Sequence, residues 1–175
     1  MTRIVVQPAD TAEARAEVFR FRQDRGVRPS ETLLPGARVS GGALRDALDP
    51  LAILITARDR VSGTLLGAVR VNFAHEGLDH YPALYAFSTL DPGACINVTV
   101  TSGWVVAWDA LGLEVPLALS RGVYDLLRRE RVRYDYLDCT PAEQPFFESL
   151  GYRGLHAIHN PNRGLTRLMR LEVSD

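Results

Sequence analysis

The chain has 175 residues, 46% of them hydrophobic and 23% charged, which predicts one compact domain over residues 1–175 and leaves no room for a second. The formal net charge of −1 gives no global electrostatic reason to bind nucleic acid or an anionic membrane. Two cysteines are too few for a disulfide framework, and the sequence shows neither a signal peptide nor a membrane-spanning stretch, so we expect a cytoplasmic protein.

The first predicted unit is a strand followed by a helix. Residues 4–6 are typical of a short strand, and Asp10 or Thr11 then caps an amphipathic helix that ends before Gly26. Residues 27–43 hold two prolines and three glycines without clear periodicity. We therefore expect a loop there, of the kind that often covers a substrate site.

A β-hairpin follows. Residues 51–57 form a continuous apolar run, as in a strand buried on both faces, and residues 58–63 form a turn into a second strand at 65–73. Because side chains alternate along a strand, Arg70 lies on a mixed face of that second strand.

A short helix over residues 83–87 and a long strand over residues 95–108 come next. Alternate positions of the strand from 97 to 101 form a polar row, which Gly103 interrupts. A glycine inside a strand commonly marks a bulge or a close backbone approach. It can also serve only to relieve crowding, here beside Trp104.

The rest of the chain predicts two helices and three strands. Residues 115–131 form an amphipathic helix that docks on a sheet. A strand at 132–139, a helix near 141–150 and two strands at 152–159 and 165–173 complete the prediction.

The C-terminal third carries a resemblance to a known superfamily. Residues 147–152 read Phe-Glu-Ser-Leu-Gly-Tyr, which is similar to the aromatic-acidic-x-Leu-Gly-Phe/Tyr segment that ends the last helix of the GNAT superfamily of N-acyltransferases. Within that superfamily the chain most resembles the bacterial N-acyl amino acid synthases and the acyl-homoserine-lactone synthases. Residues 15–19 resemble their Arg-x-x-Val-Phe pattern, residues 46–52 their Asp-x-x-Asp, and residues 63–70 their Gly-x-x-x-Gly-x-x-Arg. Each motif is weak alone, and their order and spacing carry the resemblance.

The resemblance implies an α/β (α+β) GNAT fold. Its central sheet would be mixed, mostly antiparallel, with six or seven strands and about four flanking helices. The sheet would splay between the fourth and fifth strands, here 95–108 and 132–139. The implied activity moves an acyl group, by the closer likeness a fatty acyl group, to a primary amine of an amino acid, small molecule or peptide. The donor would be acyl-CoA or the phosphopantetheine of an acyl carrier protein, and no metal is implied.

The resemblance also implies site residues. A backbone N–H at a bulge near Gly103 would polarise the thioester carbonyl, and a group in the loop after the third strand would act as general base. Asp46 and Asp49, which the resemblance places among the acceptor-binding residues, can instead form structural ion pairs with Arg15, Arg20 or Arg70. The implied catalytic residues are Thr101, Ser102, Gly103, Trp104, His75 and Glu76. The implied donor-binding residues are Val105, Val106, Gly112, Leu113, Cys139, Phe146 and Phe147. The implied acceptor-binding residues are Arg15, Phe19, Asp46, Asp49 and Arg70.

The chain departs from the superfamily pattern in a loop and at Phe147, and from the lactone synthase motif at Val100 and Gly103. The glycine-rich loop that cradles the pyrophosphate of coenzyme A is replaced by residues 109–116, which contain one glycine and two acids. Nucleotide binding should therefore be weakened, which favours an acyl carrier protein as donor. Phe147 stands where many acetyltransferases place a tyrosine that protonates the leaving thiolate, and a phenyl ring has no proton to donate. Val100 and Gly103 replace the Glu and Arg of the lactone synthases' Glu-x-Ser-Arg, so a lactone product is not expected.

Other interpretations stay open. An acetyl-CoA-dependent acetyltransferase is one alternative, and a non-catalytic module that binds an acyl chain or a partner protein is another. A precursor peptide is a possible acceptor, and the oligomeric state is not predicted. Cys139 is more typical of a buried apolar residue than of an acyl-carrying nucleophile. His156 and His159 point to opposite faces of a strand, which argues against a metal site.

Overall fold

The computed structural model describes residues 3–25, 37–76, 85, 97–107, 112–160 and 163–174. Within these ranges a seven-stranded sheet has the order β1-β4-β5-β6-β7-β9-β8, and β2 and β3 form a separate hairpin. The strands are β1 (Ile4–Pro8), β2 (Arg38–Ser40), β3 (Ala43–Arg45), β4 (Ile53–Asp59), β5 (Leu65–Phe73), β6 (Val98–Val106), β7 (Tyr134–Cys139), β8 (Arg153–Asn160) and β9 (Gly164–Glu172). The helices are α1 (Ala12–Asp24), α4 (Glu114–Arg129) and α5 (Gln144–Ser149), with 3-10 turns η2 (Asp49–Leu51) and η3 (Ala74–Glu76).

The expected mixed, mostly antiparallel sheet is confirmed. Every neighbouring pair of strands in it is antiparallel except β6 and β7, which run parallel. The part of the chain that the structure describes holds three α-helices rather than about four. The helix expected at 83–87 lies, apart from Tyr85, outside the described residues. None of the described helices is long and apolar enough to cross a membrane.

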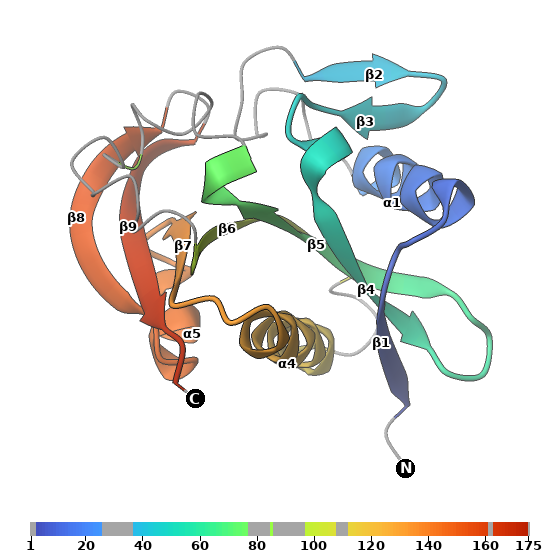
Figure 1. Cartoon of the computed structure of the whole chain (residues 1–175). Coiled ribbons are helices and arrows are strands. Elements are labelled where there is room, and N and C mark those ends of the chain that lie inside the picture. Colours follow the sequence, from blue (N-terminus) through green and yellow to red (C-terminus); the bar gives the residue numbers. More distant parts are fainter. Residues whose placement is uncertain are drawn as a thin grey trace.

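Helices cover the two faces of the sheet separately (Figure 1). On one face, α4 buries Val115, Leu119 and Val123 in a core shared with β4, β5 and β7. On the other face, α1 buries Val18 and Phe21 against β4 and β5. Each face of the central strands is therefore covered by a different helix, α4 on one face and α1 on the other.

The hairpin of β2 and β3 corrects one expectation. Residues 27–43 were expected to hold no regular element, but Ser40 pairs with Ala43 across a two-residue turn. Gly41 and Gly42 have φ of 57° and 72°, and two consecutive positive φ values make the tight turn that suits the twist of a hairpin. Leu44 of β3 is fully buried, and β3 packs on α1. Residues 26–36 lie outside the described part of the chain.

The predicted splay between the two central strands is confirmed. Parallel pairing of β6 with β7 covers Val98–Val100 against Tyr134–Tyr136 and then stops. β6 continues to Val106 on its antiparallel partner β5, and β7 continues to Cys139 on its antiparallel partner β9. Within the described ranges, the second half of β6 therefore has no strand partner on its β7 side.

Candidate active site

A bulge lies in β6 where its pairing with β7 has ended. Arg70 pairs with Ser102, but Ala68 pairs with Val105, so two steps along β5 match three along β6. The extra residue lies at Gly103, whose φ is 63°. Residues with a Cβ avoid this region, which explains the glycine. The bulge predicted from the sequence is confirmed.

The extra residue reverses the alternation of side chains along β6. Before the bulge, Thr99 faces the α4 side of the sheet and Ser102 faces the α1 side, where it accepts a hydrogen bond from Arg70. After the bulge, Trp104 and Val106 join the core on the α4 side, and Val105 joins the α1 side. An unbroken strand would have turned Trp104 toward α1.

A buried charge cluster occupies the α1 side of the bulge. Arg70 of β5 is 2% exposed. Its Nη1 donates to Asp46 Oδ1 at 2.5 Å and to Asp49 Oδ1 at 3.0 Å, and its Nε donates to Ser102 Oγ at 3.1 Å. Of the two interpretations of Asp46 and Asp49, the structure shows the ion pairing with Arg70.

Arg22 of α1 completes this cluster, and the sequence analysis missed it. Its Nη1 donates to Asp49 Oδ1 at 2.8 Å, and the side chain lies over the ring of Phe19 at 5.4 Å. Arg22 is 5% exposed, and its Nε and Nη2 have no hydrogen-bond partner among the described residues. The available signal was its spacing: Arg22 follows Arg15 by two helical turns, which puts both on one face of α1.

Ion pairing and burial oppose each other in the cluster. Burial alone would raise the pKa of Asp49, but Arg22 and Arg70 outweigh it, so this pKa lies below its ordinary value. Burial lowers the pKa of Arg22, and Asp49 acts in the opposite direction. Two guanidinium groups therefore face two carboxylates, Asp46 and Asp49, in a space almost closed to water.

Arg15 and Phe19, two of the predicted acceptor-binding residues, contact residues of the charge cluster. Arg15 donates from Nη1 to the carbonyl of Ala52 at 2.9 Å and from Nη2 to the carbonyl of Asp49. It thereby holds the η2 turn that presents the Asp49 side chain. Phe19 is buried, with the guanidinium groups of Arg22 and Arg45 over its ring.

The α4 side of the bulge is aromatic. The ring of Phe147 of α5 makes edge contacts with Trp104 at 5.8 Å, Phe146 at 5.2 Å and Tyr152 at 5.9 Å. Beside these rings lies a pocket of about 390 Å³, lined by Trp104, Tyr152, the end of β9 and the C-terminal half of α4. The α4 side of the bulge therefore presents aromatic side chains, whereas the ion-paired cluster of Arg22, Arg70, Asp46 and Asp49 lies on the α1 side.

Cys139 does not have the properties of a nucleophile. It ends β7 in the core on the α4 side with no exposed surface. Burial raises the pKa of its thiol to about 11, so the unreactive protonated form prevails at neutral pH. The structure therefore favours the interpretation of Cys139 as a small buried residue.

Several predicted residues lie away from the bulge. Gly112 and Leu113 are exposed at the start of α4, where Leu113 makes no side-chain capping bond. His75 and Glu76 are exposed in η3, next to Phe73, which pairs with Thr99 at the beginning of β6. Within the described part of the chain, neither His75 nor Glu76 forms a hydrogen bond or ion pair with the charge cluster. Among the described residues no group of three His, Cys, Asp or Glu side chains could hold a metal ion.

Asp135 is a second buried acid that the sequence analysis did not single out. It lies on β7 beside the last paired residues of β6, where Thr99 donates to it at 2.6 Å and Tyr152 at 2.5 Å. Burial raises the pKa of Asp135 to about 6, although both hydroxyls favour the ionised form.

We expect this group to make the fold less stable as pH rises from about 4 to 6. An ordinary aspartate in the unfolded chain is ionised above about pH 4, whereas folded Asp135 holds its proton until about pH 6. The folded state therefore binds the extra proton, and raising the pH through this window costs up to about 3 kcal/mol.

Asp135→Asn removes this titration. The unfolding free energy of the variant relative to the wild type should rise by up to about 3 kcal/mol between pH 4 and 7, measured by denaturant unfolding. Glu17, Asp49 and Asp59, whose pKa values are lowered in the folded state, are present in both proteins, so their contributions cancel in the difference. A difference that does not change with pH would contradict the prediction.

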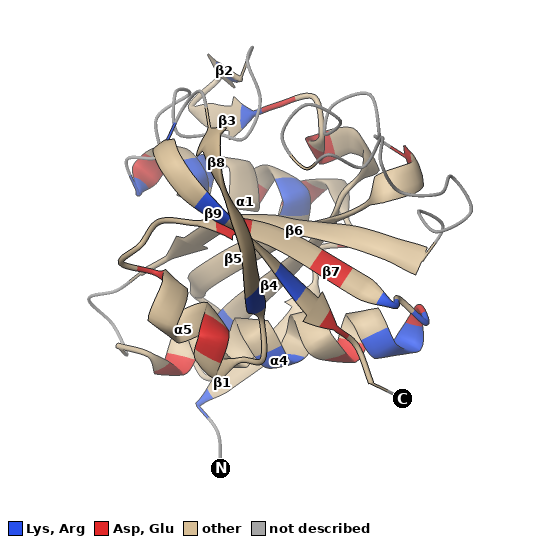
Figure 2. Cartoon of the chain, turned by 90° about the vertical axis from the view of Figure 1, so that its left-hand side faces the viewer, with Lys and Arg blue, Asp and Glu red and all other residues tan. Residues whose placement is uncertain are grey.

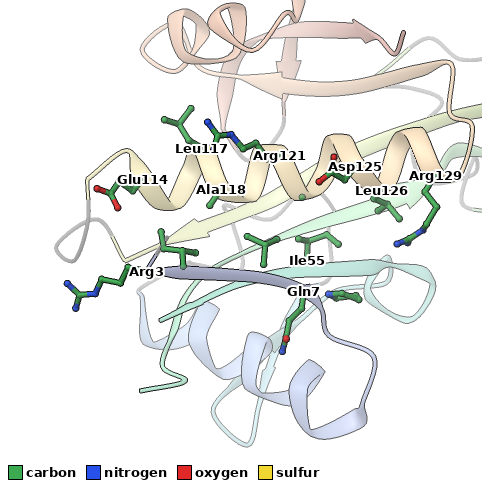
Figure 3. Close-up of a pocket in the computed structure, with 14 residues that line it drawn as sticks. Arg3, Gln7, Ile55, Glu114, Leu117, Ala118, Arg121, Asp125, Leu126 and Arg129 are labelled. Carbon is green, nitrogen blue, oxygen red and sulfur yellow. The ribbon is translucent and has the colours of Figure 1, made fainter. Parts of the chain in front are cut away.

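A separate groove of about 920 Å³ runs between β1 and α4 (Figure 3). Its rim carries Arg3, Arg121 and Asp125, and its floor includes Ile55. It shares no lining residue with the charge cluster or the bulge. Basic and acidic segments are interspersed along α4 and across the sheet (Figure 2), in keeping with the near-zero net charge.

Comparison with known proteins identifies the architecture. No protein-family model and no curated protein matches the sequence. Among solved structures, FeeM, an N-acyl amino acid synthase from uncultured soil microbes, matches with TM-score 0.67 over 98% of this chain and 92% of its own, at 14% identity. BjaI, a CoA-dependent acyl-homoserine lactone synthase solved with SAM and isopentyl-CoA, matches with TM-score 0.72 over 98% and 83%, at 16% identity. A GCN5-related N-acetyltransferase from Kribbella flavida matches with TM-score 0.54 over 97% and 98%, at 20% identity.

The chain has the GNAT fold. The resemblance inferred from the C-terminal segment and the spaced motifs is confirmed at the level of fold over nearly the whole chain. In the GNAT numbering of strands, β6 and β7 are the fourth and fifth, and the bulge at Gly103 lies on the fourth where the two separate.

Proposed function

We propose that this GNAT chain is a cytoplasmic, single-domain N-acyltransferase. It moves an acyl group, preferentially a fatty acyl group, from a thioester to the primary amine of an amino acid, small molecule or peptide. The observation that carries the proposal is the position of the Gly103 bulge, between an aromatic pocket on the α4 side and a buried charge cluster on the α1 side. The acyl donor then enters from the aromatic side and the amine from the charged side.

The donor side is suited to a pantetheine arm with an apolar acyl chain. Trp104, Tyr124 and Tyr152 line the pocket with aromatic surface. Among the described residues the edge of β6 beyond Val100 has no strand partner on its β7 side, which leaves backbone groups for the amides of the arm. The start of α4 carries Glu114 and no capping side chain, which disfavours a nucleotide pyrophosphate. These features support an acyl carrier protein as donor over coenzyme A, in contrast to the CoA-dependent synthase BjaI.

The bulge supplies the electrostatic part of the reaction. A backbone N–H at the Gly103–Trp104 turn polarises the thioester carbonyl, and one such preorganised donor is worth about 3–4 kcal/mol in the transition state. Ser102 is held by Arg70 on the acceptor side. Phe147 has no hydroxyl, so the leaving thiolate takes its proton from another group.

A non-catalytic GNAT module that binds an acyl chain is the second candidate. The missing hydroxyl at Phe147 and the acidic start of α4 favour it. An acetyl-CoA-dependent acetyltransferase is the third, and the aromatic pocket beside Trp104 is the feature that argues against so small an acyl group.

Ligand-dependent melting tests the donor. Palmitoyl-CoA at saturating concentration should raise the melting temperature by at least about 2–4 °C more than acetyl-CoA does, because each buried CH₂ contributes about 0.8 kcal/mol. Free coenzyme A is the control for the nucleotide. Equal shifts with palmitoyl-CoA, acetyl-CoA and free coenzyme A would contradict the fatty acyl donor, and release of thiol in the presence of amines separates the enzyme from the binding module.

A further inference from the structure

The Nε and Nη2 atoms of Arg22 have no hydrogen-bond partner among the described residues, and Nη2 lies beside Gly103 of the bulge. We propose that Arg22 is a catalytic residue whose Nη2 donates a hydrogen bond to the thioester carbonyl oxygen as that oxygen becomes an oxyanion. This inference rests on the proposed acyl transfer. A side chain of α1 then stabilises the oxyanion together with the backbone N–H of β6.

Part of the hydrogen-bonding capacity of Arg22 is not used by the described residues: Nη1 donates to Asp49, but Nε and Nη2 have no acceptor. Buried guanidinium groups normally bind acceptors with all their N–H groups, because an unsatisfied buried donor costs free energy. The carboxylates of the cluster already have donors: Asp46 Oδ1 binds Arg70 and the Leu48 amide, and Asp49 Oδ2 binds the Asp46 amide. Among the described residues, Nε and Nη2 of Arg22 are left without an acceptor. A ligand atom is the acceptor that this edge can still take.

The position of Nη2 indicates which ligand atom that is. A Cβ added at Gly103 would lie 3.4 Å from Arg22 Nη2 and 3.5 Å from Arg70 Cβ. These are van der Waals distances, so Arg22 Nη2 lies directly beside the backbone of the bulge. A carbonyl oxygen that accepts a hydrogen bond from the backbone N–H of the bulge on this side would also be within reach of the guanidinium. The acceptor amine, by contrast, would be repelled by this cation when protonated.

Arg22 is also held in place before any ligand arrives. Asp49 fixes Nη1 at 2.8 Å, and the ring of Phe19 lies under the guanidinium. A donor that does not have to reorganise when charge develops is the kind that stabilises a transition state most. The buried surroundings strengthen the interaction, because water does not compete for the oxyanion.

The step balances without any additional reactant. The amine nitrogen attacks the thioester carbon, and the C=O π pair moves to oxygen, where Arg22 and the bulge amide receive the negative charge. The pair then returns, the C–S bond breaks, and the amine's proton ends on the thiolate. Thioester and amine become amide and thiol, with no change of oxidation state. Arg22 donates hydrogen bonds throughout and transfers no proton.

The rival role for Arg22 is recognition of a carboxylate on the acceptor, and the choice of amine separates the two. Decanoyl-pantetheine serves as donor because it carries the arm common to coenzyme A and carrier protein. Hydroxylamine serves as an acceptor without a carboxylate, and glycine as an acceptor with one. Thiol release and the decanoyl product are measured for the wild type, Arg22→Met and Arg22→Lys. Arg58→Met is the matched control, because Arg58 also pairs with an acid of α1, Glu17, but lies outside the cluster.

We expect Arg22→Met to lower kcat by about 10²-fold with both amines, with the KM for the thioester within about threefold. The ammonium group in Arg22→Lys can keep an ion pair with Asp49, but the variant lacks the Nε and Nη2 donors. It should therefore fold and show the same loss of kcat, even if Arg22→Met does not fold. Arg58→Met should retain wild-type rates. A loss confined to glycine would overturn the oxyanion role in favour of carboxylate recognition, and wild-type rates in Arg22→Lys would overturn it altogether. Absence of thiol release by the wild type with either amine would instead reject the proposed function, and this inference with it.

Discussion

Replacing Gly103 by alanine should lower the maximal rate of acyl transfer by about 10²- to 10³-fold in a protein that still folds. The new Cβ would contact Arg22 Nη2 and Arg70 Cβ, at 3.4 Å and 3.5 Å, and would obstruct the approach of the carbonyl oxygen to the bulge. It would meet no backbone atom, so the fold can accept it. The positive φ of 63° adds a backbone penalty of about 1–2 kcal/mol for a residue with a Cβ. Valine would add β-branching to that strain, which makes alanine the cleaner change.

Gly63→Ala is the matched control for the backbone penalty. Gly63 has φ of 73° in the turn between β4 and β5, and a Cβ there would have no heavy atom within 4 Å. Both variants should lose similar stability in denaturant unfolding, while only Gly103→Ala loses rate in single-turnover acyl transfer. If Gly103→Ala transferred acyl groups at the wild-type rate, the bulge would have no part in catalysis and the non-catalytic module would gain support.

Replacing Asp49 by alanine should destabilise the protein by about 3–5 kcal/mol. Asp49 accepts from both Arg22 and Arg70 at 2.8 Å and 3.0 Å, and all three side chains are at most 7% exposed. Without it, two buried guanidinium groups face Asp46 as the one carboxylate left in the described cluster. Removing one partner of a buried ion pair leaves an uncompensated charge, which costs more than the pair contributed.

Denaturant unfolding of Asp49→Ala measures this effect, with Glu17→Gln as control. Glu17 pairs with Arg58 at 2.5 Å, but its side chain is 40% exposed, so its loss should cost no more than about 1 kcal/mol. Combining Asp49→Ala with Arg22→Met should cost less than the sum of the single changes, because the second change removes one of the unpaired charges. Strict additivity would show that Arg22 and Asp49 do not depend on each other.

Features with a local physical cause were predictable from the sequence. The strand at 65–73 has the bounds expected from its apolar run, and Thr11 caps α1 as one of the two residues proposed for that role. Gly103 indicated a bulge because its neighbours favour strand and glycine alone adopts positive φ freely. The hairpin at 38–45 was missed because its strands have three residues each, too few to show a period.

Apart from the short hairpin at 38–45, the sequence by itself determined the succession of the described strands and helices, the glycine that breaks β6 and, through the resemblance of its spaced motifs, the GNAT architecture. Only the tertiary structure decided which charges meet and which are left over. Arg22 reaches Asp49 across 27 residues, Arg70 reaches Ser102 across 32, and Tyr152 reaches Asp135 across 17. Whether a polar group is buried, paired or free depends on how distant elements pack, and no local pattern encodes it. The edge of Arg22 that has no partner among the described residues is therefore found beside Gly103 only once α1 packs on the sheet.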